Sequence, residues 1–439
     1  MNSLQLFMPC AAGVEGFLAD EIHQITGLTG QDLLTARGGV MARASWRDAQ
    51  RINLHSRLTQ RVLVQLSETP YRNENDLYQA ASAVAWEIWF TPKQTFKIEI
   101  TAQHSPLTSL NFAALKIKDA VADRFRAKRG ERPSVDTTWP DVRIYAHVTP
   151  ETLNLYIDTS GEPLFKRGWR TDKGDAPLKE TLAAAMIAAS GWDATVPLYD
   201  PCCGSGTIPI EAAQIACGIA PGLQRRFGFE KLLPFQNHVW QGLIEEARDL
   251  EHEPTAPVFG SDVAFRMVDF SERNAERAGV SGVIEFRGGD ALQRMPPSEA
   301  PGVMLLNPPY GERIAAAGVA GRGRDNFQPG ALASSRAADQ SHHRETAQTD
   351  DGGDFFAQLA SHWKKNYSGW SAWMLTPDLK LPSKMRLKES RRVPMWNGPI
   401  ECRLFRFDMV KGSLKRVPGD GTNSPAGTPG PDASGSSAP

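Results

Sequence analysis

A carboxamide, two prolines and an aromatic ring follow one another at Asn307, Pro308, Pro309 and Tyr310, directly after an apolar stretch. The side-chain oxygen of Asn307 and the carbonyl of Pro308 are two acceptors that can bind both N–H groups of an exocyclic amino group and aim its lone pair at a methyl carbon. The prolines stiffen the loop, and the Tyr310 ring offers a face for a flipped base. Asn307, Pro308 and Tyr310 are therefore candidate catalytic residues, with a purely structural Pro-Pro turn as the alternative.

A glycine-rich turn lies upstream, in the stretch Asp-Pro-Cys-Cys-Gly-Ser-Gly at 200–206. We expect it to follow a strand over 196–199 and to precede a helix over 207–217, whose free N–H groups face the same crevice. The GK[ST] ending of a phosphate loop is missing, and Pro209 stands where a dinucleotide fingerprint has its third glycine. These absences favour S-adenosylmethionine over nucleotide phosphates, with a plain tight turn as the alternative. The residues expected to hold this cofactor are Asp200, Cys202, Gly204 and Gly206.

Carboxylates recur at the ends of the next two predicted strands. Asp262 follows a strand over 258–261, where a carboxylate can accept hydrogen bonds from both ribose hydroxyls. Asp290 and Ala291 follow a strand over 283–287, where they are placed to meet the adenine edge. Either carboxylate alone is more typical of a loop or cap residue, but their recurrence at successive strand ends favours a cofactor role.

The spacing between the first two carboxylates indicates an insertion. Asp262 lies roughly sixty residues after Asp200, whereas about twenty is usual in dinucleotide-binding units. We assign the excess to a segment at about 220–254, which carries Arg225, Arg226 and an amphipathic helix near Trp240. Outside this segment, strands alternate with helical patterns from residue 179 onward, which predicts a mainly parallel sheet with helices on both faces. The first 158 residues instead mix short strands and helices, which predicts small α+β units.

These residues resemble the class I S-adenosylmethionine-dependent methyltransferases of nucleic-acid amino groups. The Asp-Pro-Cys-Cys-Gly-Ser-Gly turn and the Asn-Pro-Pro-Tyr-Gly-Glu-Arg loop are most similar to the THUMP-domain RNA methyltransferases, and among them to the bacterial 23S rRNA guanine-N2 methyltransferases. Further similarity lies in the segments 166–170, 176–183, 396–398 and 401–404 and in the helix over 111–126. The resemblance covers roughly residues 1–412.

The resemblance implies an α/β fold, in which α+β ferredoxin-like and THUMP domains precede a Rossmann-like class I methyltransferase domain with an antiparallel last strand. We expect the ferredoxin-like region at 1–44, the THUMP RNA-binding domain at 45–158, the methyltransferase domain at 159–412 and a disordered tail at 413–439. A disordered insertion is expected at about 315–353, where large apolar residues are scarce. Some family members carry a second, 7-methylguanosine-forming domain downstream, which the tail predicts to be absent here.

A basic run lies in the expected THUMP domain. Between residues 116 and 132 there are seven basic residues and three acidic ones, which could contact RNA phosphates or simply form a solvated helix face. The candidate RNA-binding residues are Lys116, Lys118, Arg124, Arg126, Lys128 and Arg129. Trp139, Trp169 and Trp396 could stack on bases, with core packing as the alternative for most tryptophans.

Composition narrows the remaining possibilities. The formal net charge of the 439-residue chain is -1, so any nucleic-acid footprint must be a local patch. The five cysteines have neither Cys-x-x-Cys nor zinc spacing, which predicts reduced cytoplasmic thiols and no metal site. No stretch is long and apolar enough to predict a membrane span, and the oligomeric state is left open.

The function implied by the resemblance is methyl transfer from S-adenosylmethionine to the exocyclic N2 amino group of a guanine in 23S rRNA. The expected partner is this rRNA, either naked or in an early assembly intermediate. One alternative is an adenine-N6 methyltransferase on DNA or RNA, since a similar Asn-Pro-Pro-Tyr site serves that amino group. The other is a non-catalytic rRNA assembly factor.

Overall fold

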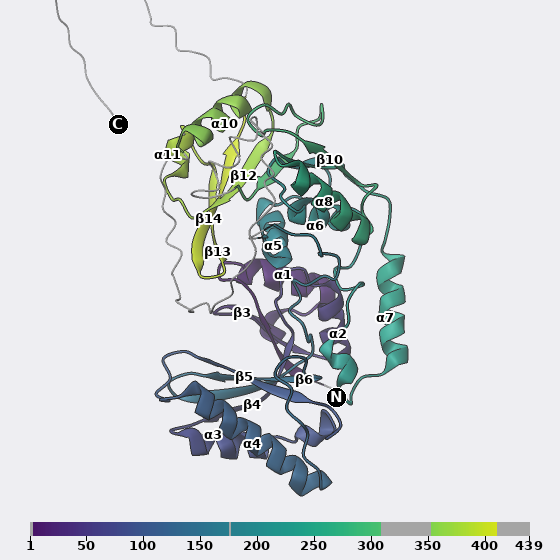
Figure 1. Ribbon diagram of the computed structural model, residues 1–439, viewed down its shortest axis with the longest axis vertical. Helices are drawn as coiled ribbons and strands as arrows, with labels where there is room; N and C mark the ends of the chain where they lie inside the picture. Colours follow the sequence, from purple (N-terminus) through teal and green to yellow (C-terminus); the bar gives the residue numbers. More distant parts are fainter. Residues whose placement is uncertain (1–2, 175–176, 309–352, 411–439) are drawn as a thin grey trace, which may run out of the picture.

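Two seven-stranded sheets carry the architecture in the computed structural model, which describes residues 3–174, 177–308 and 353–410 (Figure 1). The first sheet takes its strands from residues 4–158 and the second from residues 198–408. Figure 1 shows the second sheet at the top, helices α1 and α2 in the middle, and α3 and α4 at the bottom. The insertion expected at about 315–353, apart from residue 353, and the tail expected at 413–439 lie outside the described residues.

The first sheet connects the two expected α+β units through backbone hydrogen bonds. It has the strand order β2-β3-β1-β4-β7-β6-β5, and β1 pairs with β4 at Leu6–Val64 and Phe7–Leu63. Its strands are β1 (Leu4–Pro9), β2 (Leu33–Ala36), β3 (Gly39–Ala44), β4 (Leu63–Pro70), β5 (Phe96–Ala102), β6 (Val142–Val148) and β7 (Thr152–Asp158). Its helices are α1 (Glu15–Thr26), α2 (Trp46–His55), α3 (Glu74–Ala83) and α4 (Leu110–Arg129). The sheet is therefore continuous across the boundary expected at residue 44.

Helix α4 is the amphipathic helix that the sequence predicts in this half. The Ser109 hydroxyl accepts a hydrogen bond from the Phe112 N–H at 3.2 Å, and the helix ends at Gly130, which has a left-handed φ of 75°. Its buried stripe includes Ile117, Val121 and Phe125, all fully shielded from solvent. Burial of this stripe turns the opposite face of α4 and its basic C-terminal turn toward solvent.

The second sheet has the order β10-β9-β8-β11-β12-β14-β13, in which β14 pairs antiparallel with β12 while β10, β9, β8, β11 and β12 run parallel. This confirms the Rossmann-like class I fold with an antiparallel last strand. The strands are β8 (Leu198–Asp200), β9 (Val258–Asp262), β10 (Ile284–Gly288), β11 (Val303–Leu306), β12 (Ser371–Thr376), β13 (Arg391–Asn397) and β14 (Ile400–Asp408). The helices are α5 (Glu180–Ser190), α6 (Thr207–Ala216), α7 (Asn237–Asp249), α8 (Phe265–Arg277), α10 (Gly353–Asn366) and α11 (Leu381–Met385).

The segment between α6 and β9 returns to the N-terminal half of the molecule. Its backbone N–H groups at Gly222 and Leu233 donate to the carbonyls of Leu54 and Trp89, at 3.0 and 2.8 Å. The short 3₁₀ helix η3 (Gly228–Lys231) and α7 follow, and α7 runs down the side of the molecule next to α2 (Figure 1). The helix expected near Trp240 is thus α7, and its segment connects the two halves of the chain.

A buried carboxylate holds the two halves together. Glu211, in α6, is fully shielded from solvent and lies between two arginines. Arg167 lies in the linker, residues 159–179 between β7 and α5, and donates from Nε to Glu211 at 3.0 Å. Arg57 of the N-terminal half donates from Nη1 at 3.1 Å. The Arg167 guanidinium also donates to the carbonyls of Leu164 and Arg57, both at 2.8 Å. Each buried charge is therefore both paired and hydrogen-bonded, which offsets much of its desolvation cost.

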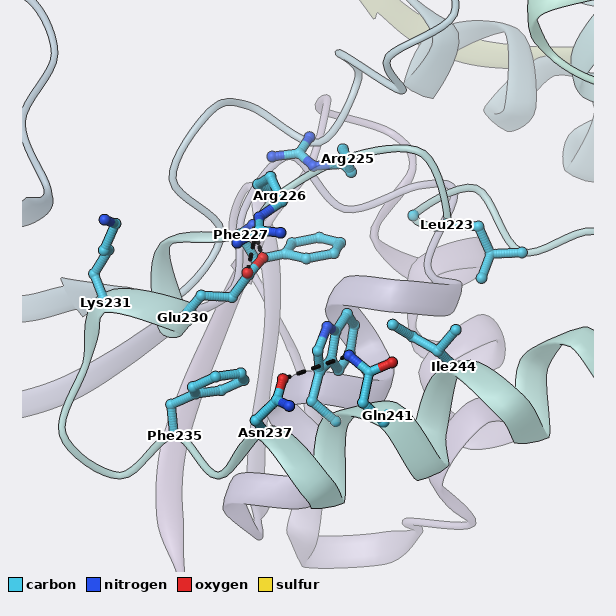
Figure 2. Close-up of a pocket in the computed structure, with 12 residues that line it drawn as sticks. Leu223, Arg225, Arg226, Phe227, Glu230, Lys231, Phe235, Asn237, Gln241 and Ile244 are labelled. Carbon is cyan, nitrogen blue, oxygen red and sulfur yellow. Dashed lines mark hydrogen bonds and ion pairs between the residues drawn. The ribbon is translucent and has the colours of Figure 1, made fainter.

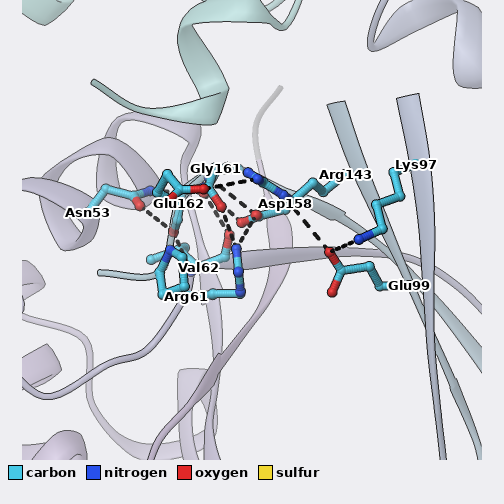
Figure 3. A network of polar contacts seen from close by, with 12 residues as sticks. Asn53, Arg61, Val62, Lys97, Glu99, Arg143, Asp158, Gly161 and Glu162 are labelled. Carbon is cyan, nitrogen blue, oxygen red and sulfur yellow. Dashed lines mark hydrogen bonds and ion pairs between the residues drawn. The ribbon is translucent and has the colours of Figure 1, made fainter. Parts of the chain in front are cut away.

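A second polar network fixes the start of the linker (Figure 3). Asp158, at the end of β7, accepts from Arg61 Nη1 at 2.7 Å and from the Ser160 N–H at 2.9 Å. The Ser160 hydroxyl in turn donates to Asn53 of α2 at 2.6 Å, and Arg143 of β6 donates to Glu162 at 3.1 Å. Four separate elements thereby fix the direction in which the chain leaves the first sheet.

We predict that Glu211→Gln destabilises the fold by about 3–5 kcal/mol, because it leaves two buried guanidinium groups without an anionic partner. The measurement is chemical unfolding followed by tryptophan fluorescence. The matched control is Glu246→Gln, which breaks the exposed Arg47–Glu246 pair and should cost less than about 1 kcal/mol. Equal unfolding curves for the two variants would show that the buried pair does not hold the halves together.

Candidate functional site

The glycine-rich turn after β8 adopts the tight strand-to-helix geometry expected from its sequence. Asp200 is 2 % exposed, and its Oδ1 accepts from the Cys202 N–H at 2.9 Å. Gly204 and Gly206 have φ values of 55° and 86°, in the left-handed region that disfavours a side chain. A Cβ at Gly206 would also lie 3.1 Å from the Ser271 side chain. Burial, together with the negative charge of Asp262, raises the pKa of Asp200 well above its ordinary value.

Asp262 connects the end of β9 to this turn. Its Oδ2 accepts from the Gly204 N–H at 3.0 Å, and its Oδ1 accepts from the Ala264 N–H at 2.9 Å. Burial raises the pKa of Asp262, while the two backbone hydrogen bonds act in the opposite direction. A carboxylate oxygen has more than one acceptor site, so each oxygen has capacity for one further donor. Additional hydroxyl donors would stabilise the charged form that burial disfavours, which fits the ribose of a nucleoside cofactor.

The loop after β10 has internal hydrogen bonds and is also hydrogen-bonded to α10. Asp290 accepts from the Leu292 N–H at 2.9 Å through its side chain and from the Arg294 N–H at 3.0 Å through its carbonyl. The Arg294 carbonyl in turn accepts from His362 Nε2 at 2.7 Å and from the Tyr367 hydroxyl at 2.8 Å. Ala291 is 7 % exposed within this loop. The residues expected at the adenine edge thus belong to one rigid loop whose position depends on α10.

The His362 ring has a defined hydrogen-bonding role. The Asn366 side-chain amide donates to His362 Nδ1 at 2.9 Å and to the His362 carbonyl at 3.1 Å. Because Nδ1 accepts in this arrangement, Nε2 carries the proton that is donated to the Arg294 carbonyl. Nothing in the sequence pattern indicated this tie, which joins two residues 68 positions apart.

The candidate catalytic loop begins at the same edge of the sheet as the cofactor turn. Strand β11 pairs in parallel with β8 through Val303–Leu198 and Met304–Tyr199. The carboxyl ends of parallel neighbours meet at one edge, so Asn307 follows its strand next to Asp200. Asn307 is half-buried and Pro308 is buried, whereas Tyr310 lies outside the described residues.

The linker lies against the cofactor turn, although its sequence did not predict a place in the site. Arg170 donates to the Thr207 hydroxyl at 2.5 Å and pairs with Glu180 at 2.9 Å. Asn274 of α8 donates to the Ser205 carbonyl at 3.0 Å and to the Asp172 carbonyl at 2.8 Å. Residues 167–172 therefore support the turn from outside, and the only signal for this role was the similarity of the segment 166–170.

The basic residues of α4 do not all remain available. Arg124 forms a two-point contact with Glu87 at 2.6 and 2.8 Å and also donates to the Ser82 carbonyl at 3.0 Å, so it stabilises the THUMP fold instead of facing solvent. Lys118 pairs with Asp119 at 2.8 Å, and Lys116 lies over the Phe112 ring. Arg126, Lys128 and Arg129 are exposed at the end of the helix. The cationic face is thus concentrated in the last turn of α4.

Two further observations limit the kind of site. Among the described residues, no group of three or more histidine, cysteine, aspartate or glutamate side chains is placed to hold a metal ion. In the same residues, no helix combines the length and apolar character needed to cross a bilayer. The described part of the site therefore consists of backbone N–H groups, carboxylates and a carboxamide.

Comparison with protein families divides the chain into three consecutive parts. A family model described as an RlmL ferredoxin-like domain matches residues 5–63, one for the THUMP domain matches residues 71–158, and one described as an RMKL-like methyltransferase domain matches residues 167–322. All three occur in the order that the sequence predicts. The methyltransferase match includes the cofactor turn, both carboxylates and the candidate catalytic loop.

Individual relatives match nearly the whole chain. Two similar proteins are called ribosomal RNA large subunit methyltransferase K/L: that of Shewanella baltica is 36% identical over 412 residues, and that of Psychromonas ingrahamii is 35% identical over 410 residues. Each match covers 92% of this chain but 54% and 50% of the relative, so the chain spans about half the length of these curated relatives.

Solved structures share the whole architecture. SMU.472, a putative methyltransferase complexed with SAH, superposes with a TM-score of 0.78 at 26% identity, covering 94% of this chain and 100% of that one. A predicted N6-adenine-specific DNA methylase from Listeria monocytogenes gives 0.76 at 26% identity, covering 93% and 96%. Together, the matched models assign this chain a ferredoxin-like domain, a THUMP domain and a methyltransferase domain of the RMKL-like family, which uses S-adenosylmethionine.

Proposed function

We propose that the protein transfers a methyl group from S-adenosylmethionine to the exocyclic N2 amino group of a guanine in large-subunit rRNA. The observation that carries the proposal is the common sheet edge, at which the Asp200 turn and Asn307 follow two hydrogen-bonded parallel strands. The names of the curated relatives, which refer to large-subunit rRNA, support the choice of substrate. The THUMP domain ahead of the catalytic sheet supports RNA over DNA.

In this proposal the cofactor is held by groups that the fold has already aligned. The Asp262 carboxylate binds the ribose hydroxyls, the loop of Asp290 and Ala291 borders the adenine, and the backbone of Gly204 and Gly206 approaches the ligand closely. Bound S-adenosylmethionine supplies an activated methyl group on a sulfonium. The protein therefore has to position the two reactants more than it has to provide a strong base.

The amino group is oriented by the loop after β11. The Asn307 side-chain oxygen and the Pro308 carbonyl accept its two N–H groups, which directs the nitrogen lone pair away from the ring and toward the methyl carbon. The Tyr310 ring stacks on the extruded base. These assignments extend the sequence prediction and rest on the position of Asn307 next to the cofactor turn.

RNA binding is assigned to the exposed cations at the end of α4. Arg126, Lys128 and Arg129 contact phosphates, with a smaller contribution from Lys116 and Lys118, which already have neighbours in the fold. Arg124 is not included because its guanidinium is paired with Glu87 and its side chain is only 18 % exposed. The expected substrate is naked rRNA or an early assembly intermediate, since a mature particle buries most of its bases.

Adenine-N6 methylation is the second candidate function. The Listeria structure described as a predicted N6-adenine-specific DNA methylase is the observation that favours it. Both acceptors are amino groups attached to an aromatic ring, so the same pair of hydrogen-bond acceptors serves either one. The base selected, and not the transfer chemistry, distinguishes the two candidates.

We predict that the wild-type protein labels large-subunit rRNA and yields N2-methylguanosine, whereas Asn307→Ala lowers kcat by at least about a hundredfold with little change in RNA affinity. The measurement is methylation with isotopically labelled S-adenosylmethionine, followed by mass spectrometry of the nucleosides. N6-methyladenosine as the product would replace the guanine assignment with the alternative. Parallel loss of RNA binding in Asn307→Ala would indicate a structural role for this residue.

Asp262→Ala should weaken S-adenosylmethionine binding by about 10- to 100-fold, because a charged acceptor of two hydroxyl hydrogen bonds is removed. Isothermal titration calorimetry with the cofactor measures the change. Asp269→Ala is the matched control, since Asp269 is an exposed aspartate of α8 paired with Arg273, and it should bind like wild type. Unchanged affinity in Asp262→Ala contradicts the ribose assignment.

His362→Ala should raise KM for S-adenosylmethionine about tenfold while leaving kcat within about a factor of two, because one of the two bonds that fix the Asp290 loop is removed. His362→Gln keeps a side-chain N–H donor and should recover most of the affinity. The control His23→Ala changes an exposed histidine of α1. A loss confined to kcat, or equal loss in the Ala and Gln variants, would rule out this positioning role.

A further inference from the structure

A cavity lies in the segment between α6 and β9, away from the cofactor turn. It has a volume of about 360 Å³, at the lower end of the range of ligand pockets. Figure 2 shows it between the loop of Phe227 and Glu230 on one side and α7, with Asn237 and Gln241, on the other. The lining combines aromatic rings, side-chain amides and cations.

The aromatic residues form a rigid floor with one accessible ring. Trp240 stands nearly perpendicular to Phe227, with centroids 5.5 Å apart and an interplanar angle of 81°. Phe227 already stacks on Phe229, with ring centroids 5.1 Å apart, and the Arg225 guanidinium lies over its ring at 5.0 Å. Phe235 is only half-buried. Its ring is tilted relative to that of Phe229, and the two ring centroids are 5.9 Å apart. Phe235 is therefore the ring on which a planar ligand could stack.

Two amides provide hydrogen-bonding groups beside this ring. The exposed side chains of Asn237 and Gln241 lie one turn apart on α7, and Gln241 Nε2 donates to Asn237 Oδ1 at 3.4 Å. Each amide keeps donors and an acceptor for an additional partner. Such groups match the edge of a nucleobase, which presents donors and acceptors in one plane.

The rim of the cavity is positively charged. The Arg226 side chain is 91 % exposed and the Lys231 side chain 60 % exposed. Glu230, the acidic residue of the lining, is already occupied, because it pairs with Arg226 at 3.0 Å and accepts from the Phe227 N–H at 2.8 Å. Arg225 donates to backbone carbonyls, among them those of Glu162 and Pro163 at 2.6 and 2.7 Å. The described lining thus carries the three cations Arg225, Arg226 and Lys231 and one carboxylate, that of Glu230. A polyanion is therefore the complementary ligand.

An exposed tryptophan lies next to this rim on the THUMP side. Trp139 is 73 % exposed, and its backbone N–H donates to Asp136 at 2.9 Å, which fixes the turn that presents it. Two residues further along, Asp141 pairs with Lys231 of the cavity rim at 3.8 Å. The loop starts from the basic end of α4, where Lys128 and Arg129 are exposed. Of the three tryptophans considered for stacking, Trp169 is buried and Trp396 is half-buried, so Trp139 has the most exposed ring.

We infer that this cavity binds one unstacked nucleotide of a single-stranded RNA segment whose neighbouring nucleotides contact Trp139 and the end of α4. Phe235 stacks on the base, the amides of Asn237 and Gln241 contact its edge, and Arg226 and Lys231 bind the flanking phosphates. The inference rests on the proposed function only in taking RNA as the substrate. It adds a second RNA contact, which lies in the segment between α6 and β9. The nucleotide bound there is a different one from the nucleotide that is methylated.

The test compares variants of the full chain in binding to a large-subunit rRNA transcript, measured by filter binding at several salt concentrations. Phe235→Leu keeps apolar packing but removes the aromatic face, and Trp139→Ala removes the second stacking ring. Each should weaken binding about tenfold, while Phe235→Trp and Trp139→Phe should bind like wild type. Arg226→Ala with Lys231→Ala should lower the slope of log affinity against log salt by about two.

Two substitutions serve as controls. Arg37→Ala changes an exposed cation in the β2–β3 turn, and Leu34→Ala changes an exposed apolar residue of β2. Both should bind RNA like wild type. All variants should retain wild-type cofactor affinity and thermal unfolding, since the cavity is distant in the fold from the cofactor turn.

Crosslinking identifies the bound ligand directly. A transcript containing 4-thiouridine, irradiated with the wild-type protein, should label the peptides that contain Phe235 and Trp139, and excess nucleoside monophosphate should not prevent it. Complete competition by the mononucleotide would overturn the inference in favour of a free-nucleotide site. Wild-type affinity and salt slope in all cavity variants would also overturn it. If these binding and crosslinking results hold but the wild-type protein forms no N2-methylguanosine in the rRNA, the proposed function fails instead.

Discussion

The placement of the catalytic domain depends on the buried carboxylate of Glu211. The same helix, α6, carries this residue in its middle and forms the cofactor turn at its beginning. Arg57 and Arg167 approach Glu211 from the N-terminal half and from the linker, so one anion joins three parts of the chain. A shift of either arginine would leave a buried charge unpaired, which costs several kcal/mol. The cofactor turn is therefore coupled directly to the domain that precedes it.

The linker extends this coupling to the site itself. From Arg167 onward it contacts α6, then α5 through Arg170, and then α8 through Asp172, whose carboxylate pairs with Arg277 at 2.6 Å. These contacts pack the linker against the helices that flank the turn. The loop after β10 receives its support from α10 instead, through His362 and Tyr367. The cofactor site is thus held by segments that do not themselves contact the cofactor in our proposal.

Local sequence signals were sufficient for the parts of the site that depend on one strand and its following turn. Asp200, Gly204 and Asp262 could be located because strand ends, glycines and carboxylates leave a pattern within a few residues. The pairing of β11 with β8 followed from the general geometry of parallel sheets, which brings Asn307 to the same edge. The mainly parallel sheet was predictable from the alternation of strands and helices, whereas the strand order of either sheet was not predicted.

Features that depend on distant side chains were not predictable. The tie from His362 to the Arg294 carbonyl crosses 68 positions, and neither residue carries a local signal for it. Arg124 resembles its neighbours in the basic run, and only the position of Glu87 shows that its charge is used inside the fold. Helices α2, α3 and α8 were also not singled out, because their apolar positions are few and their stability comes from packing against the sheets.

The pairing of β1 with β4 has a mechanical consequence. Two domains joined by a flexible tether can adjust their separation to a ligand, but strands that share one hydrogen-bonded ladder cannot bend freely about the junction. Together with the buried Glu211 pairs that join the N-terminal half to α6, this ladder fixes the distance between the outer strands and the cofactor turn. In our proposal, an RNA bound at the THUMP end would therefore present to the catalytic loop only those nucleotides that its own folded shape places at that distance, so the choice among many similar bases would depend on span.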